Sequence, residues 1–205
     1  MTKPDMKKHF KHMTPRSFLP VAIAGGFAVV LLIVLAVFVL KPAEHVGPSQ
    51  QELASDYANG LKYERGDNVT VNYQTAMEWY RKAADAGYPP AELSVGILHM
   101  AGRGTPKDPK QAAEWFRRAA EHGLPEAQVQ LSGDVLIGVA AADGKPDKIE
   151  ALKWLLLGAD AVTDPLVKQV AVTQRAALEG ELTADERAEA EKRADAWRKE
   201  HAPQE

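Results

Sequence analysis

The chain has 205 residues, a formal net charge of -3 and no cysteine. The absence of cysteine excludes disulfide bonds, zinc sites built from thiolates and cysteine nucleophiles. The charge is unevenly distributed, because residues 1–17 carry five basic side chains against one acidic side chain, which leaves the remainder distinctly acidic. An acidic remainder without a basic face argues against nucleic-acid binding, so we expect no nucleic-acid partner.

Residues 18–40 are an uncharged apolar run of 23 residues. At about 1.5 Å per residue, a helix of this length spans a hydrocarbon core of roughly 30 Å. We therefore predict a single transmembrane helix, preceded by a basic tail at 1–17 and followed by a linker at 41–50. A cleaved signal peptide is the alternative, but its apolar region is usually about 7–15 residues long. The length of the run and Pro42 favour an uncleaved anchor.

The orientation of this segment follows from its flanking charges. Five basic residues precede it and only Lys41 follows directly, so the positive-inside rule keeps the N-terminus in the cytoplasm. We expect the protein in a bacterial inner membrane, with the C-terminal part in the periplasm. Two pairs of small residues four apart would let a second membrane helix approach closely, which is compatible with a homo-oligomer: Ala22 with Gly26, and Ala24 with Ala28.

The rest of the chain repeats with a period of 36 residues. The segment Trp79–Gly87 recurs as Trp115–Gly123, and the matches extend upstream to Gly60 and Gly96. A third, degraded copy follows, in which three inserted residues shift the matches to an offset of 39: Asp147, Ala151 and Trp154. A fixed period of this size is typical of stacked repeat architectures.

Each repeat is predicted to form two antiparallel helices. Gly87 and Gly123 stand where a left-handed residue ends a helix, and Pro89 and Pro125 follow at two residues. In the second copy, apolar residues at helical spacing form one stripe: Ala112, Trp115, Phe116, Ala119 and Ala120. The small alanines favour close approach of neighbouring helices, as a stack of hairpins requires.

These residues resemble the Sel-one-like repeat, a relative of the tetratricopeptide repeat. The middle copy carries most positions of that pattern: Ala91, Gly96, Gly102, Gly104, Asp108, Ala112, Trp115, Phe116, Ala119, Ala120 and Gly123. It departs at His99, where the family usually has tyrosine, and the first copy has Asn68 in place of the second loop glycine. The resemblance implies an all-α fold, a right-handed α-solenoid of helix-turn-helix repeats, with about three repeats over 51–160.

Residues 161–205 are predicted to form two capping helices. Asp164 and Pro165 are typical of a helix start, and we expect that helix to run to about Leu178 and to end at Gly180. Thr183 and Glu186 have the spacing of a capping box, and a highly charged helix follows. Its polar outer face would close the stack, as solenoids require.

No combination of residues predicts chemistry. His99 is expected in the core or lining a groove, and His122 lies at a helix end where its partial positive charge complements the dipole. The glycines and lysine of 102–107 lack the strand and the G-K-[ST] helix start of a phosphate-binding loop. We therefore predict a protein that is not an enzyme, with no catalytic residue, no cofactor and no metal site.

The resemblance implies a scaffold or adaptor that binds a protein partner of unknown identity and is tethered through residues 18–40. From repeat geometry we predict a partner-binding groove lined by the first helices: Tyr57, Lys62, Tyr63, Ser94, Leu98 and His99. The alternative is an accessory or assembly subunit of a larger membrane complex, held mainly through its transmembrane helix.

Overall fold

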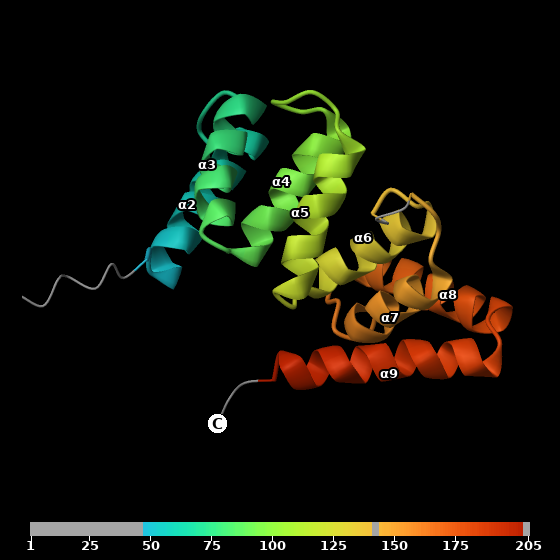
Figure 1. Ribbon diagram of the computed structural model, residues 1–205. Coiled ribbons are helices and arrows are strands. Elements are labelled where there is room, and N and C mark those ends of the chain that lie inside the picture. Colours follow the sequence, from blue (N-terminus) through green and yellow to red (C-terminus); the bar gives the residue numbers. More distant parts are fainter. Residues whose placement is uncertain (1–46, 141–143, 203–205) are drawn as a thin grey trace, which may run out of the picture. The chain divides into compact units, whose positions relative to one another are not determined.

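The computed structural model describes residues 47–140 and 144–202, which form eight α-helices and no strand (Figure 1). The chain divides into a compact unit, Gly47–Glu205, and a separate unit, Met1–Val46. The helices of the described part follow in the order α2 (Gln50–Arg65), α3 (Tyr73–Asp85), α4 (Pro89–Ala101), α5 (Pro109–Glu121), α6 (Pro125–Leu136), α7 (Lys148–Gly158), α8 (Pro165–Glu181) and α9 (Ala184–Glu200).

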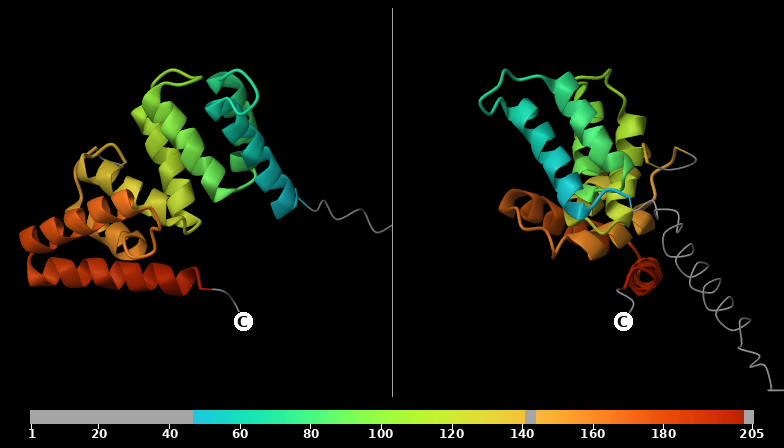
Figure 2. Two further views of the ribbon diagram at one scale, coloured as in Figure 1. Left: turned by 180° about the vertical axis from the view of Figure 1, so that it is seen from behind. Right: turned by 90° about the vertical axis from the view of Figure 1, so that its left-hand side faces the viewer.

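The first six helices form three hairpins, α2 with α3, α4 with α5 and α6 with α7 (Figures 1 and 2). The same cap begins the second helix of each hairpin: the side chains of Asn72, Asp108 and Asp147 accept hydrogen bonds from backbone N–H groups of the first turn. Such caps satisfy donors that a helix start leaves free. The predicted period of 36 residues therefore describes real structural units.

The loop inside each hairpin needs backbone in the left-handed region. In the second hairpin, Gly102 and Gly104 have φ values of 68° and 69°. In the first hairpin Asn68 takes the place of Gly104, and its φ is 58°. Asparagine tolerates this region better than most residues, so the departure from the repeat pattern preserves the turn.

The two helices of a hairpin approach closely where a glycine faces a ring. A Cβ atom built on Gly60 would lie 2.4 Å from the Tyr80 ring, and one on Gly96 would lie 2.4 Å from the Phe116 ring. In the third hairpin the glycine position is Ser132, and the ring position is the smaller Leu155, which is fully buried. In the degraded third repeat, the larger residue at the glycine position is therefore compensated by a smaller residue at the ring position.

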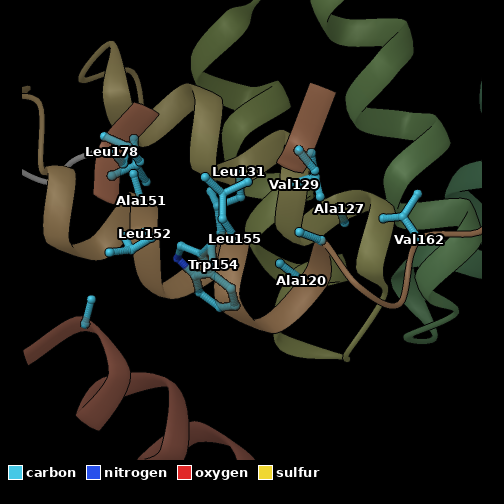
Figure 3. Packing of buried hydrophobic residues seen from close by; sticks show 14 of the residues in the cluster. Ala120, Ala127, Val129, Leu131, Ala151, Leu152, Trp154, Leu155, Val162 and Leu178 are labelled. Carbon is cyan, nitrogen blue, oxygen red and sulfur yellow. The ribbon is translucent and has the colours of Figure 1, made fainter. Parts of the chain in front are cut away.

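Adjacent hairpins share their apolar side chains. One cluster joins the first two hairpins around Tyr80, Val95 and Leu98. A second cluster joins the later hairpins and α8, and Figure 3 shows Leu178 of α8 close to Ala151 of α7. Because each hairpin completes its core against the next, the described repeats form an all-α solenoid.

The last two helices depart from this stacking rule. α8 packs on α7 as a fourth first helix would, but α9 also packs on α7 and makes little contact with α8. The Trp197 ring of α9 lies 6.3 Å from the Trp154 ring of α7, edge to face. The predicted capping box of Thr183 and Glu186 is present, and Ala190 and Ala194 of α9 are buried.

Two predictions from the sequence are not confirmed by the described residues. The helix α8 was expected to end at Gly180 but continues to Glu181, because Gly180 does not have the positive φ of a terminating glycine. The predicted basic tail, transmembrane helix and most of the linker, residues 1–46, lie outside the described residues. Within the part that is described, no helix has the length and apolarity that crossing a membrane requires.

Candidate protein-binding surface

The first helices α4, α6 and α8 share one register. Each begins with a proline: Pro89, Pro125 and Pro165. Counting from these prolines aligns Val95 with Leu131 and Ala171, and all three are fully buried. The residues that face away from the stack in these helices therefore occupy equivalent positions, and α2 joins the series at an offset of 36 residues.

These outward positions define what we call the first-helix face. None of its members is buried. They are Ala54, Ala58, Leu61 and Arg65 from α2; Pro90, Ser94, Ile97 and Ala101 from α4; Glu126, Gln130, Gly133 and Ile137 from α6 and its C-cap; and Leu166, Val170, Thr173 and Ala177 from α8.

The first-helix face is apolar and almost uncharged, with Arg65 and Glu126 its only charged members. It also holds most of the large apolar side chains that the described residues expose: Ile97 is 45% exposed, Ile137 68%, Leu166 78% and Val170 52%. By contrast, the exposed residues of α3, α5 and α9 are mainly charged. Exposed apolar side chains at equivalent positions of successive helices indicate a candidate surface for association.

Gly133 adds a second feature to this face. It lies inside α6, where glycine destabilises a helix by about 0.5–1 kcal/mol relative to alanine. A Cβ atom at Gly133 would meet nothing within 4 Å, in contrast to Gly60 and Gly96. Packing among the described residues therefore does not account for this glycine, whereas a partner in contact with its exposed backbone would.

The six predicted groove residues differ in their exposure to solvent. Leu98 is 1% exposed and His99 is 6% exposed, so neither side chain presents a surface to a partner. Leu98 faces the preceding hairpin, which covers it. Their placement in a groove needs correction for this reason: Leu98 and His99, four and five residues after Ser94, belong to the core.

The other four residues are accessible to different degrees. Lys62 is exposed, because it occupies the position of Leu98 in a helix that no described helix precedes. Tyr57, Tyr63 and Ser94 are half-buried, and the Tyr57 ring lies 5.5 Å from the Tyr80 ring. Ser94 belongs to the first-helix face. The exposed isoleucines of that face were missed, although an apolar residue at a solvent position of the repeat would have signalled them.

Burial also sets the chemistry of His99. Its two ring nitrogens have no hydrogen-bond partner, and burial lowers its pKa, with Asp108 acting in the opposite direction. The imidazole is therefore neutral at pH 7. In the described part of the chain, no group of three His, Asp or Glu residues is placed to hold a metal ion.

A group of ion-paired side chains that the sequence did not predict lies within the second hairpin and contacts the first. Glu92 is fully buried, and its carboxylate lies 3.1 Å from Nη2 of Arg118 and 2.8 Å from Nδ1 of His122. Arg118 also donates to the backbone oxygen of Ala84 at the end of α3, at 3.0 Å. His122 thus has an acidic partner beyond the helix-end role expected from sequence, and this group is structural.

Two hollows among the described residues lie away from the first-helix face. The larger one, of about 1280 Å³, lies between α5, the start of α7 and Leu182. Side chains of both charges line it, including Arg117, Asp147 and Glu150. None of the six predicted groove residues lines it or the smaller hollow beside Trp197.

The repeats match a known family over most of the described region. The Sel1 repeat model matches residues 49–88, 89–124 and 125–161, which together exceed half of the chain. The chain belongs to the Sel1 repeat family. The boundaries between the three Sel1 repeats fall at the starts of α4 and α6, so each match is one hairpin with its loop. No curated protein matches the chain.

Two solved Sel1-type structures are similar to the chain. A protective antigen of uropathogenic Escherichia coli with the SLR fold is 26% identical over 89% of this chain, with a TM-score of 0.61. This chain spans 40% of that antigen's length. A Sel1 repeat protein from Oxalobacter formigenes is 30% identical, with a TM-score of 0.52, and the match covers 60% of this chain and 89% of that protein. These similarities support a Sel1-repeat scaffold of the kind used in protein–protein interaction.

Proposed function

We propose that the protein is a membrane-tethered adaptor that binds a protein partner on the part of the first-helix face contributed by α2, α4 and α6. The observation that carries this proposal is the line of exposed, uncharged side chains on successive first helices, with Ile97 and Ile137 in the repeats. An uncharged apolar surface favours binding of an apolar stretch of a partner protein, because burying apolar side chains is favourable. The exposed backbone at Gly133 allows that stretch to approach closely.

The tether is proposed from sequence. The uncharged run of residues 18–40 is long enough to span a bilayer, and the basic residues before it favour a cytoplasmic N-terminus. The Sel1 repeats would then lie on the periplasmic or other extracytoplasmic side. Anchoring raises the effective concentration of the repeats near partners at the same membrane. The proposal assigns no catalytic step, cofactor or metal to the chain.

Two matched substitutions test the face. Ile97→Glu places a charge on the first-helix face, and Val71→Glu places one in the first loop, where the side chain is equally exposed at 46% against 45%. We expect Ile97→Glu, alone or with Ile137→Glu, to reduce the capture of crosslinked partners from native membranes by at least tenfold. Val71→Glu should leave capture unchanged. Equal capture by all variants would overturn the assignment of this face.

Deleting residues 1–40 separates the adaptor from the accessory-subunit alternative. A freed repeat domain that still captures the partner in a manner sensitive to Ile97→Glu supports the adaptor. A freed domain that captures nothing, while the full chain captures polytopic membrane proteins through residues 18–40, supports the accessory subunit. Circular dichroism of the freed domain verifies that its helices remain folded.

A further inference from the structure

The exposed side of α8 has a regular pattern. Leu166, Val170, Thr173 and Ala177 follow each other at intervals of four, three and four residues, and Gly180 continues the series. All five are exposed, and Leu166 is the most exposed large apolar residue described, at 78%. Spacing of this kind forms the seam along which two helices pack. We call these five residues the α8 seam.

The charges of α8 are kept away from the seam. Lys168 donates to the backbone oxygen of Asp160, and Arg175 pairs with Asp160 and Glu179. Glu181 pairs with Lys148 of α7 at 2.8 Å. The residues that flank the seam are uncharged over most of its length: Val167, Gln169, Gln174 and Ala176. An identical helix can therefore approach the seam without repulsion between like charges.

The seam is also complementary to itself in size. Its first half carries the large side chains of Leu166 and Val170, and its second half carries Ala177 and Gly180. In an antiparallel pair centred on Thr173, Leu166 of one copy faces Gly180 of the other, and Val170 faces the region of Ala177. Large residues thus meet small ones along the whole contact, as close helix packing requires.

Neither backbone conformation nor packing among residues 47–140 and 144–202 explains the glycine at position 180. Its φ is not positive, so the backbone does not require glycine. A Cβ atom built on it would meet nothing within 4 Å. A glycine that is needed neither for the turn nor for internal packing leaves room for a side chain from outside, and the antiparallel arrangement supplies Leu166.

We propose that α8 is a dimerisation helix, which pairs with α8 of a second copy in an antiparallel, two-fold arrangement centred on Thr173. Because the two copies use the same patch, the contact closes and does not propagate into a filament. The helix has 17 residues and is about 25 Å long, so the contact area falls below that of a tight dimer. A shared membrane would raise the effective concentration of the two copies.

The absence of cysteine makes a direct test available. In the full chain in its native membrane, Thr173→Cys should form a disulfide-linked dimer on mild oxidation, because the two-fold axis brings the two cysteines together. Thr70→Cys, an exposed threonine in the first loop, should remain monomeric. Leu166→Cys alone should not crosslink to itself, whereas Leu166→Cys with Gly180→Cys should.

Variants in the Thr173→Cys background distinguish the seam from general collision. Val170→Glu should reduce the dimer at least tenfold, and Val172→Glu, on the charged side of the same helix, should not. Gly180→Leu should also reduce it while increasing helix propensity, so that its effect cannot come from loss of the helix. The proposal is overturned by absence of the Thr173→Cys dimer, by equal crosslinking at Thr70→Cys, by self-crosslinking at Leu166→Cys, or by a product with a different protein.

Discussion

Gly96 and Gly133 both lie inside first helices, but their surroundings give the same substitution opposite effects. Gly96→Ala would place a methyl group 2.4 Å from Cε1 of Phe116, and we expect it to reduce the free energy of unfolding by about 1–3 kcal/mol. In Gly133→Ala the added methyl group has no neighbour within 4 Å, and we expect the free energy of unfolding to rise by about 0.5–1 kcal/mol. Denaturant unfolding followed by circular dichroism measures both. Equal destabilisation by the two variants would contradict this account.

Asp134 is a buried carboxyl group at the position that Leu98 occupies in the preceding repeat. One of its oxygens has no partner, and burial raises its pKa from 3.8 to about 6. Between these values the folded protein binds more protons than the unfolded chain, so stability falls as the pH rises from about 4 to about 6 and stays lower above that range.

Replacing this carboxyl group removes the penalty. We expect Asp134→Asn to increase the free energy of unfolding at pH 8 by about 1 kcal/mol, with solvent screening taken into account, and to leave it unchanged near pH 4. Thermal unfolding of both proteins across this range provides the measurement. An unaltered pH dependence in the variant would show that Asp134 does not contribute to it.

At the scale of the elements, the contact between hairpins is made in two chemically different ways. Between the first and second hairpins, Arg118 donates to the backbone oxygen of Ala84, and Glu92, from the same hairpin as Arg118, forms an ion pair with that arginine. Between the second and third, the equivalent carbonyl of Ala120 accepts from Nε2 of Gln128 at 3.2 Å. Gln128 stands at the position of Glu92, and Leu157 at the position of Arg118. An uncharged form of the contact between hairpins therefore occurs within the same chain.

This repetition predicts a compensating pair of substitutions. Arg118→Leu alone leaves the buried Glu92 carboxylate with His122 only and should reduce the free energy of unfolding by on the order of 2 kcal/mol. Adding Glu92→Gln recreates the arrangement of the third repeat and should restore most of the loss. A double-mutant cycle from denaturant unfolding measures the coupling. A double variant less stable than Arg118→Leu would contradict the equivalence of the two contacts.

Most elements could be predicted from sequence because their signals are local. Asp108 caps α5, and Thr183 with Glu186 caps α9, through backbone groups two or three residues away. The end of α8 at Gly180 was wrong, because glycine ends a helix only where the backbone turns to positive φ. The predicted groove included Leu98 and His99, which are buried, since the sequence pattern alone did not fix which side of α4 the preceding hairpin covers.

For the whole molecule, the proposed anchor makes a prediction about extraction and topology. The full chain should resist extraction from membranes with alkaline carbonate, and a chain lacking residues 1–40 should be released. A reporter that is active only outside the cytoplasm should be active when fused after residue 205, because the basic residues are concentrated before the apolar run. Release of the full chain by carbonate, or a silent reporter, would contradict the tether or its orientation.

The sequence by itself determined the repeat, its hairpins, its caps and its family, because a period of 36 residues and the capping side chains act within one unit. Only the tertiary structure decided which side of each first helix is covered, that Glu92 pairs with Arg118 and His122 while Arg118 reaches Ala84 across a repeat boundary, and that α9 packs on α7 and not on the outer side of α8. These features depend on contacts between residues far apart in the chain. A local sequence pattern does not predict such contacts.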